Sequence, residues 1–257
     1  MQEYSGLRLS RRSILAVPAV AACAVVVGQA MPARADDKRK ADAAWSDADA
    51  AVAVTSRDPM NGERLAPVTM VVFGEYQCPF CGKLEETIGK LTARYGAKTL
   101  RVVFKQFPLD MHARAKPASL AAEAVFERGG NKAFWLFHQR AFANQKDLTD
   151  DNFVKWAKEA GMEEKAFKTA AASKPVAERV AALMQQGKDL GVTGTPTSFV
   201  NGVLVSGSRD EADFAKIIDA EITATQALVG KVKADRVYVE RCNANMAAAL
   251  AAKKSKP

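Results

Sequence analysis

Residues 68–91 read VTMVVFGEYQCPFCGKLEETIGKL, and this stretch decides the fold. Its first six residues are apolar or β-branched and lie between a proline and a glycine, a pattern that predicts a buried strand. Residues 83–91 carry leucine and isoleucine at helical spacing with glutamates near the start, which predicts a helix. The two cysteines, Cys78 and Cys81, therefore lie where a strand ends and a helix begins.

This position of the two thiols favours redox chemistry. The unpaired N–H groups and the dipole at a helix N-terminus stabilise a thiolate and lower its pKa. A zinc site is the competing interpretation, but it needs four ligands. The sequence holds no second CxxC motif, and its only histidines are His112 and His138. We therefore expect a dithiol that exchanges disulfides, with no metal and no other cofactor.

Composition limits the remaining classes of protein. The chain has 257 residues, of which 48% are hydrophobic and 26% charged, as is ordinary for a soluble protein with one core and an inserted subdomain. The formal net charge is +8, but lysines and arginines are scattered and do not alternate with aromatic residues. This distribution is typical of solvated surfaces, so we expect no nucleic-acid partner.

The N-terminus predicts export. Residues 1–35 contain the pair Arg11-Arg12, an alanine-rich apolar run and the cleavage pattern Ala33-Arg34-Ala35. The arginine pair favours a twin-arginine signal peptide, and a Sec signal is the alternative. A membrane-spanning segment over residues 14–31 and a lipid-bearing Cys23 are two further readings. We expect a periplasmic or otherwise exported protein, anchored to the membrane only under those two readings.

Export bears on the cysteines because disulfides persist outside the reducing cytosol. Removal of the signal peptide leaves Cys78, Cys81 and Cys242, an odd number with one close pair. A framework of structural disulfides is therefore disfavoured, and the close pair is free to be catalytic.

The rest of the chain predicts an α/β unit interrupted by helices. A tether over 36–50 precedes an edge strand at 51–54 and a turn-rich segment at 56–62, and a second central strand covers 100–107. Residues 197–200 and 203–205 flank Asn201-Gly202, a strong hairpin signal. The expected segments are the α/β unit at 51–112 and 191–229, the helical insertion at 113–190 and a C-terminal helical extension at 230–257.

Four motifs together carry a family resemblance. They are FGEYQCPFC at 73–81, FPL at 107–109, the helical block, and GTPT at 194–197. This set resembles the DsbA-like thiol:disulfide oxidoreductases over about residues 50–229. The resemblance implies an α/β, thioredoxin-like fold with an α-helical insertion domain.

The resemblance also implies roles for individual residues. Cys78 would be the attacking thiol and Cys81 the resolving thiol. Thr195-Pro196 would form a cis peptide bond beside them, whereas a trans turn that merely starts a strand is the alternative. Pro79 and Phe80, together with Thr195 and Pro196, would contact the substrate, which pairs with the exposed backbone as an extended segment.

The sequence departs from the family in several positions. Six residues before Cys78, where thioredoxin has a buried carboxylate, stands Val72. Glu75 is nearer, and we expect it to be solvated at the strand end. Phe80 replaces the histidine of the strongly oxidising DsbA. We expect His112 to be a cap or packing residue, and His138 to belong to helix packing.

The leading hypothesis is an exported dithiol oxidase. Its substrates would be exported proteins with reduced or mispaired cysteines, and a quinone-linked membrane partner would reoxidise it. The alternatives are an isomerase or reductase of the same fold, and a non-enzymatic module that binds copper, zinc or peptides. The redox potential of the Cys78/Cys81 pair decides between oxidase and reductase.

Overall fold

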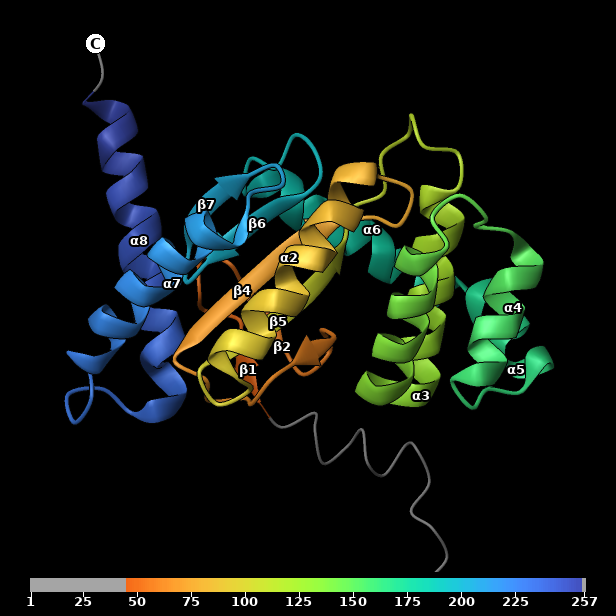
Figure 1. Cartoon of the computed structure of the whole chain (residues 1–257), viewed down its shortest axis with the longest axis horizontal. Helices are drawn as coiled ribbons and strands as arrows, with labels where there is room; N and C mark the ends of the chain where they lie inside the picture. The colour runs from red at the N-terminus through yellow and green to blue at the C-terminus, as the bar shows by residue number, and fades with distance from the viewer. Residues whose placement is uncertain (1–44, 256–257) are drawn as a thin grey trace, which may run out of the picture. The chain divides into compact units, whose positions relative to one another are not determined.

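A computed structural model describes residues 45–255, so the predicted signal peptide and residues 36–44 of the predicted tether lie outside the described residues. The centre of the structure is a five-stranded sheet of order β3-β5-β4-β6-β7 (Figure 1). Its strands are β3 (Met60–Asn61), β4 (Val68–Gly74), β5 (Leu100–Gln106), β6 (Thr197–Val200) and β7 (Val203–Ser206).

Strand pairing places the CPFC motif after the carboxyl end of β4, the central strand of the sheet. β4 and β5 are parallel, with Val72 opposite Phe104, and their carboxyl ends therefore lie side by side. β6 runs antiparallel to β4 and forms a hairpin with β7. Asn201 and Gly202 have φ values of 44° and 88°, the left-handed backbone that a tight hairpin turn requires. The predicted hairpin is confirmed.

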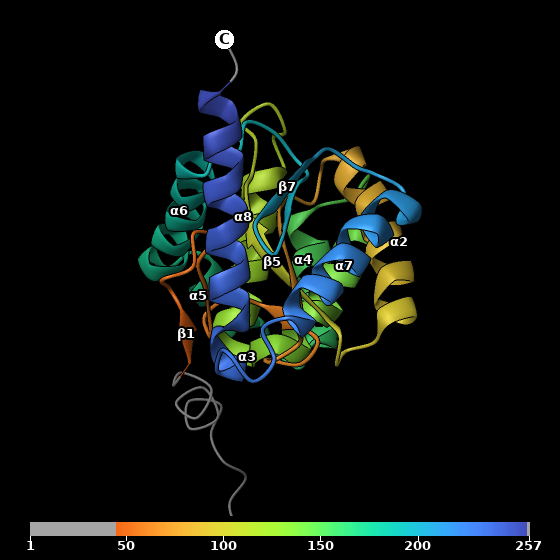
Figure 2. The same cartoon turned by 90° about the vertical axis from the view of Figure 1, so that its left-hand side faces the viewer.

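Helices cover both faces of the sheet. Figure 2 shows α2 and α7 on one side of the strands and α6 and α8 on the other. The helices are α2 (Pro79–Tyr95), α3 (Ala115–Ala143), α4 (Asp150–Glu159), α5 (Glu164–Ala171), α6 (Lys174–Asp189), α7 (Glu211–Gln226) and α8 (Val237–Lys254), with a 3-10 turn at Ala234–Arg236 before α8. The predicted α/β fold with a helical insertion is confirmed.

The alternation of side chains along β4 separates two cores. Val68, Met70 and Val72 face α2, α3 and α7 in the larger core. Val71 and Phe73 point to the opposite face, where they pack in a second core with residues of the N-terminal segment and of α8. Because both faces are covered, every residue of β4 is buried.

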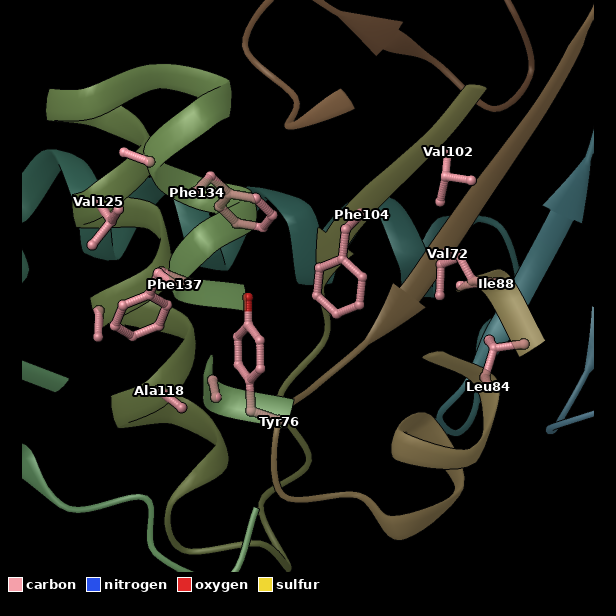
Figure 3. Packing of buried hydrophobic residues seen from close by; sticks show 14 of the residues in the cluster. Val72, Tyr76, Leu84, Ile88, Val102, Phe104, Ala118, Val125, Phe134 and Phe137 are labelled. Carbon is pink, nitrogen blue, oxygen red and sulfur yellow. The ribbon is translucent and has the colours of Figure 1, made fainter. Parts of the chain in front are cut away.

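The helical insertion packs against the sheet through aromatic rings. Helix α3 is broken at Gly130, whose φ is 68°. In Figure 3 the ring of Tyr76, from the loop after β4, stands between Phe104 of β5 and Phe137 of α3. Its ring centroid lies 5.7 Å from that of Phe104 and 6.3 Å from that of Phe137. These contacts fix the insertion beside the CPFC turn.

The N-terminal segment differs from the expectation of a tether followed by an edge strand. β1 (Ser46–Asp47) pairs with β2 (Val54–Thr55) in a separate two-stranded sheet, and residues 51–53 are not a strand. Asp47 is buried because its carboxylate accepts hydrogen bonds from Arg64 and Arg101, each within 3 Å. The prediction is wrong here because those partners are remote in sequence.

Helix α8 fastens this segment to the sheet. Tyr238 donates a hydrogen bond to the Val52 carbonyl at 2.5 Å, and Asn243 contacts the backbone of Asp49 and Ala51. At its other side, Arg241 forms an ion pair with Glu221 of α7 at 2.7 Å. Within residues 45–255, no helix combines the length and the apolar character needed to cross a membrane.

Candidate active site

Cys78 stands at the N-cap of α2, and Pro79 occupies the first helical position. A proline fits there because its missing N–H has no partner in the first turn in any case. The carbonyl of Cys78 accepts hydrogen bonds from the backbone N–H groups of Cys81 and Gly82, at 3.1 and 3.2 Å. The first turn of α2 thus brings the two thiols together, as the sequence predicts.

The two thiols have opposite acid–base properties. The hydrogen bond from Cys81 is the largest cause that lowers the pKa of Cys78 to about 5, against an ordinary 9.0. Thr195 and the backbone N–H groups of Phe80 and Cys81 also lower this pKa, whereas burial opposes them. The same hydrogen bond, followed by burial, raises the pKa of Cys81 far above its ordinary value. At neutral pH the pair therefore carries one negative charge, on Cys78.

The loop before β6 lies against this turn. The Thr195–Pro196 peptide bond is cis, and the Cys78 sulfur lies 3.3 Å from the Thr195 carbonyl oxygen, to which it donates when it is protonated. The predicted cis bond and its place beside Cys78 are confirmed. The buried Thr195 hydroxyl has no hydrogen-bond partner among the described residues, so it is free to turn toward a thiolate.

The middle residues of CPFC face outward. Pro79 is exposed, and the Phe80 side chain is 56% exposed next to Cys78. The Lys83 ammonium lies 5.5 Å from the centre of the Phe80 ring. An exposed ring beside a reactive thiol is available to a partner chain, but the substrate-binding roles of Pro79 and Phe80 stay predictions.

Glu75 overturns the expectation of a solvated carboxylate. It is 0% exposed, and its carboxylate is held by the His112 ring Nδ1 and by the Gln77 backbone N–H, the latter at 2.5 Å. Burial is the largest cause that raises the pKa of Glu75, with His112 opposing it. His112 is therefore a partner of a buried acid beside the dithiol, rather than only a cap or packing residue.

The segment that carries His112 is tied to the active-site loop at both ends. Phe107 donates its backbone N–H to the Gly74 carbonyl at 2.8 Å, and Arg114 donates its backbone N–H to the Gln77 side chain at 2.6 Å. The position of His112 after the Phe107-Pro108-Leu109 segment was the sequence signal for this contact. Its partner was hidden because the two residues lie 37 positions apart.

Gln145 is a third contact that sequence reasoning missed. Its side-chain amide, from the loop after α3, donates to the carbonyls of Tyr76 and Cys78, at 2.8 and 2.9 Å. A Cβ atom at Gly82 would lie 2.2 Å from the Gln145 Oε1 atom, so the glycine leaves room for this side chain. Nothing in the local sequence marks a glutamine in a loop as a support for a remote turn.

The other histidine packs as predicted. His138 is buried in α3 among the rings of Tyr76, Phe104 and Phe142, with its Nδ1 atom 3.2 Å from the Tyr76 hydroxyl. Cys242 lies in the second core, where its sulfur accepts the Val52 N–H at 3.3 Å. Within residues 45–255, no three side chains of His, Cys, Asp or Glu form a group suited to a metal ion.

Comparison with known proteins places this site in a family. The thioredoxin family profile matches residues 54–220, well over half of the chain. The Na(+)/H(+) antiporter NhaA 3 of Salinispora tropica is 35% identical over 147 residues, which are 57% of this chain and 22% of the antiporter. The chain thus spans only a minor part of the antiporters that it matches.

A second relative and a solved structure agree with this assignment. The probable disulfide bond formation protein D of Bacillus cereus is 29% identical over 170 residues, covering 63% of this chain and 77% of that protein. The crystal structure of oxidised BdbD from Bacillus subtilis has a TM-score of 0.60 at 23% identity, over 65% of this chain and 94% of that one. The chain therefore belongs to the thioredoxin family, and its helical insertion gives it the architecture of the DsbA-like thiol–disulfide oxidoreductases.

Proposed function

We propose that this protein is an exported dithiol oxidase that introduces disulfides into exported proteins through Cys78 and Cys81. One observation carries the proposal: the pKa of Cys78 is lowered to about 5 while that of Cys81 is raised. A dithiol with this asymmetry has one sulfur that leaves readily as a thiolate and one that stays protonated.

The exchange proceeds in two steps. A substrate thiolate attacks the Cys78 sulfur of the oxidised pair, which forms a mixed disulfide and releases Cys81 as a thiolate that takes up a proton. The second substrate thiol, as its thiolate, then attacks the substrate sulfur of the mixed disulfide. The substrate leaves oxidised, and Cys78 leaves as a stabilised thiolate. The two electrons stay on the dithiol until a disulfide-bearing, quinone-linked membrane partner accepts them.

The same asymmetry supports the oxidising direction of exchange. Stabilising the Cys78 thiolate stabilises the reduced protein, and this makes its disulfide a stronger oxidant. A reductase requires a reduced protein that gives up its electrons readily, which a pKa of about 5 disfavours. The similarity to a disulfide bond formation protein supports the same direction.

The test combines trapping of a mixed disulfide with measurement of the redox potential of the Cys78/Cys81 pair. Cys81→Ser whose Cys78 has first been joined to glutathione in a disulfide should accumulate a mixed disulfide with reduced substrate proteins, because the substrate thiolate attacks the Cys78 sulfur and glutathione leaves. Cys78→Ser treated in the same way should trap far less. The equilibrium constant of the wild-type pair with glutathione should lie on the oxidising side. Equal trapping by the two variants, or a strongly reducing pair, would contradict the proposal.

Two further parts of the proposal have separate tests. Export rests on the sequence of residues 1–35, and N-terminal sequencing of the exported protein should show cleavage after Ala35. The metal-binding alternative predicts about one zinc or copper ion per chain in protein purified under reducing conditions. We expect elemental mass spectrometry to find far less.

A further inference from the structure

Glu75 and His112 form a hydrogen-bonded pair beside the dithiol that the exchange steps do not use. Glu75 is 0% exposed and lies three residues before Cys78. Within residues 45–255, His112 is the only basic side chain within ion-pair distance of this carboxylate. A buried carboxylate next to a thiolate is unfavourable because two like charges in a site of low polarity repel each other strongly.

We infer that the Glu75–His112 pair sets how readily Cys78 carries its negative charge, with His112 as a positioning residue that acts through Glu75. The inference rests on the proposed function because it concerns the same dithiol. The two side chains that adjust the pKa of Cys78 lie outside the CPFC motif.

The backbone holds Glu75 between the two sulfurs and His112. Its carboxylate accepts the N–H of Gln77, the residue directly before Cys78. On the other side, its backbone forms a hydrogen bond with the Cys81 sulfur, and a Cβ atom at Gly74 would lie 3.4 Å from that sulfur. Glu75 is fully buried and both of its carboxylate contacts lie inside the fold, so its charge is held beside the dithiol.

The interaction between Glu75 and Cys78 is reciprocal. Burial is the largest cause that raises the pKa of Glu75, and the Cys78 charge raises it by a smaller amount, so ionised Glu75 must in turn oppose the Cys78 thiolate. The other groups around Glu75 are the Gln77 backbone, Cys81 and His112. Of these, His112 is the one that offsets the carboxylate from another segment of the chain. Its ring is 23% exposed, so it also connects the buried acid to solvent.

The decisive variant is Glu75→Gln. The amide can keep both contacts, since its oxygen accepts the Gln77 N–H and its nitrogen faces the His112 ring. We expect the pKa of Cys78, followed by thiolate absorbance at 240 nm, to fall, and the equilibrium with glutathione to shift about tenfold toward the reduced protein. Glu86→Gln, an exposed site on α2, removes the same charge and should shift the equilibrium less than twofold.

His112 is tested in two backgrounds at pH 8. In the wild type, His112→Phe leaves the carboxylate without its partner and should shift the equilibrium with glutathione about threefold in the opposite direction. His112→Asn, which keeps a donor near the Nδ1 position, should restore part of this loss. In Glu75→Gln, His112→Phe should change nothing, because no carboxylate remains for it to offset.

The outcomes separate this inference from the proposed function. If Glu75→Gln shifts the equilibrium less than twofold, or if His112→Phe has the same effect in both backgrounds, the inference is wrong while dithiol exchange stands. If the wild-type pair does not exchange with glutathione, the proposed function fails first. Thermal unfolding of each variant identifies any that has lost its fold. Loss of fold would not make the Glu75 and His112 variants shift the glutathione equilibrium in opposite directions.

Discussion

Two regions of the molecule bury charge, and they stabilise it in different ways. On β5, Arg101 contacts Asp47 at 2.9 Å and Lys105 contacts Asp58 at 2.8 Å, and all four side chains are at most 2% exposed. At the start of α2, hydrogen-bond donors stabilise the Cys78 thiolate. A buried ion pair fixes a structure, because removal of either member leaves a charge without its partner. The Cys78 thiolate is held by neutral donors instead. It can therefore become part of a disulfide, and so lose its charge, without leaving a buried cation unpaired.

The largest expected effect concerns the buried ion pair of Asp58 and Lys105. Asp58→Ala leaves Lys105 and Arg179 without their shared carboxylate, and we expect a loss of about 3–5 kcal/mol in the free energy of unfolding. Denaturant titration measures this loss. The pKa of Cys78 should stay unchanged, and Asp189→Ala, at an exposed site on α6, should cost far less. A loss below about 1 kcal/mol would show that the ion pairs of Asp58 with Lys105 and Arg179 do not hold the N-terminal segment against the rest of the fold.

The second effect is the pH dependence of the reduced protein. Between pH 5 and 9 the unfolded chain keeps a proton that folded Cys78 has released, so the free energy of unfolding rises with pH. We expect the reduced protein to gain roughly 2–4 kcal/mol over this window, relative to the oxidised protein, in which this thiol is absent. Thermal unfolding of both forms at several pH values measures the difference. Parallel curves would contradict a lowered pKa for Cys78.

The third effect tests which donor stabilises the thiolate. Cys81→Ala removes the hydrogen bond that contributes most, so the pKa of Cys78 should rise by about one to two units. Absorbance at 240 nm follows this titration directly. Cys242→Ala, which removes a buried thiol from the second core, should leave the Cys78 titration unchanged. A shift of equal size in both variants would assign the effect to general loosening of the fold.

The smallest expected effect concerns Glu123, a buried carboxyl group near the ion pair of Asp58 and Lys105. Burial, the largest cause, raises the pKa of Glu123 to about 7, although Arg179 opposes it. Between pH 4.5 and 7 the folded protein holds a proton that the unfolded chain releases, so this residue lowers stability as pH rises. Glu123→Gln should therefore stabilise the protein by about 1 kcal/mol at pH 8 and by little at pH 4.5. Destabilisation at pH 8 would show that Glu123 acts there as a third member of the ion-pair cluster.

Local signals in the sequence were sufficient for the central part of the fold. The apolar run of β4, the Asn201-Gly202 turn and the CPFC motif predicted the strands and the place of the dithiol. The cis bond at Thr195 came from the family resemblance. Each of these features depends on neighbouring residues or on a short motif, so the sequence displays it directly.

Contacts between remote segments could not be predicted in the same way. The burial of Glu75 depends on His112, and that of Asp47 depends on Arg101, 54 positions away. A charged residue in a polar stretch looks solvated until the fold supplies its partner. The Gln145 amide, which supports the CPFC turn from the helical insertion, gives no local signal at all.

The packing of α8 has a consequence for anyone who shortens this protein. The second core joins Val71, Phe73 and Phe199, which lie inside the family match at residues 54–220, to Val52 and Tyr238, which lie outside it. Cutting the chain at the limits of the family match would remove α8 and the segment before β2, and with them part of the cover on one face of the sheet. The smallest autonomous folding unit is therefore larger than the family match. A shortened chain would expose an apolar surface, and we expect it to aggregate before its redox chemistry could be assayed.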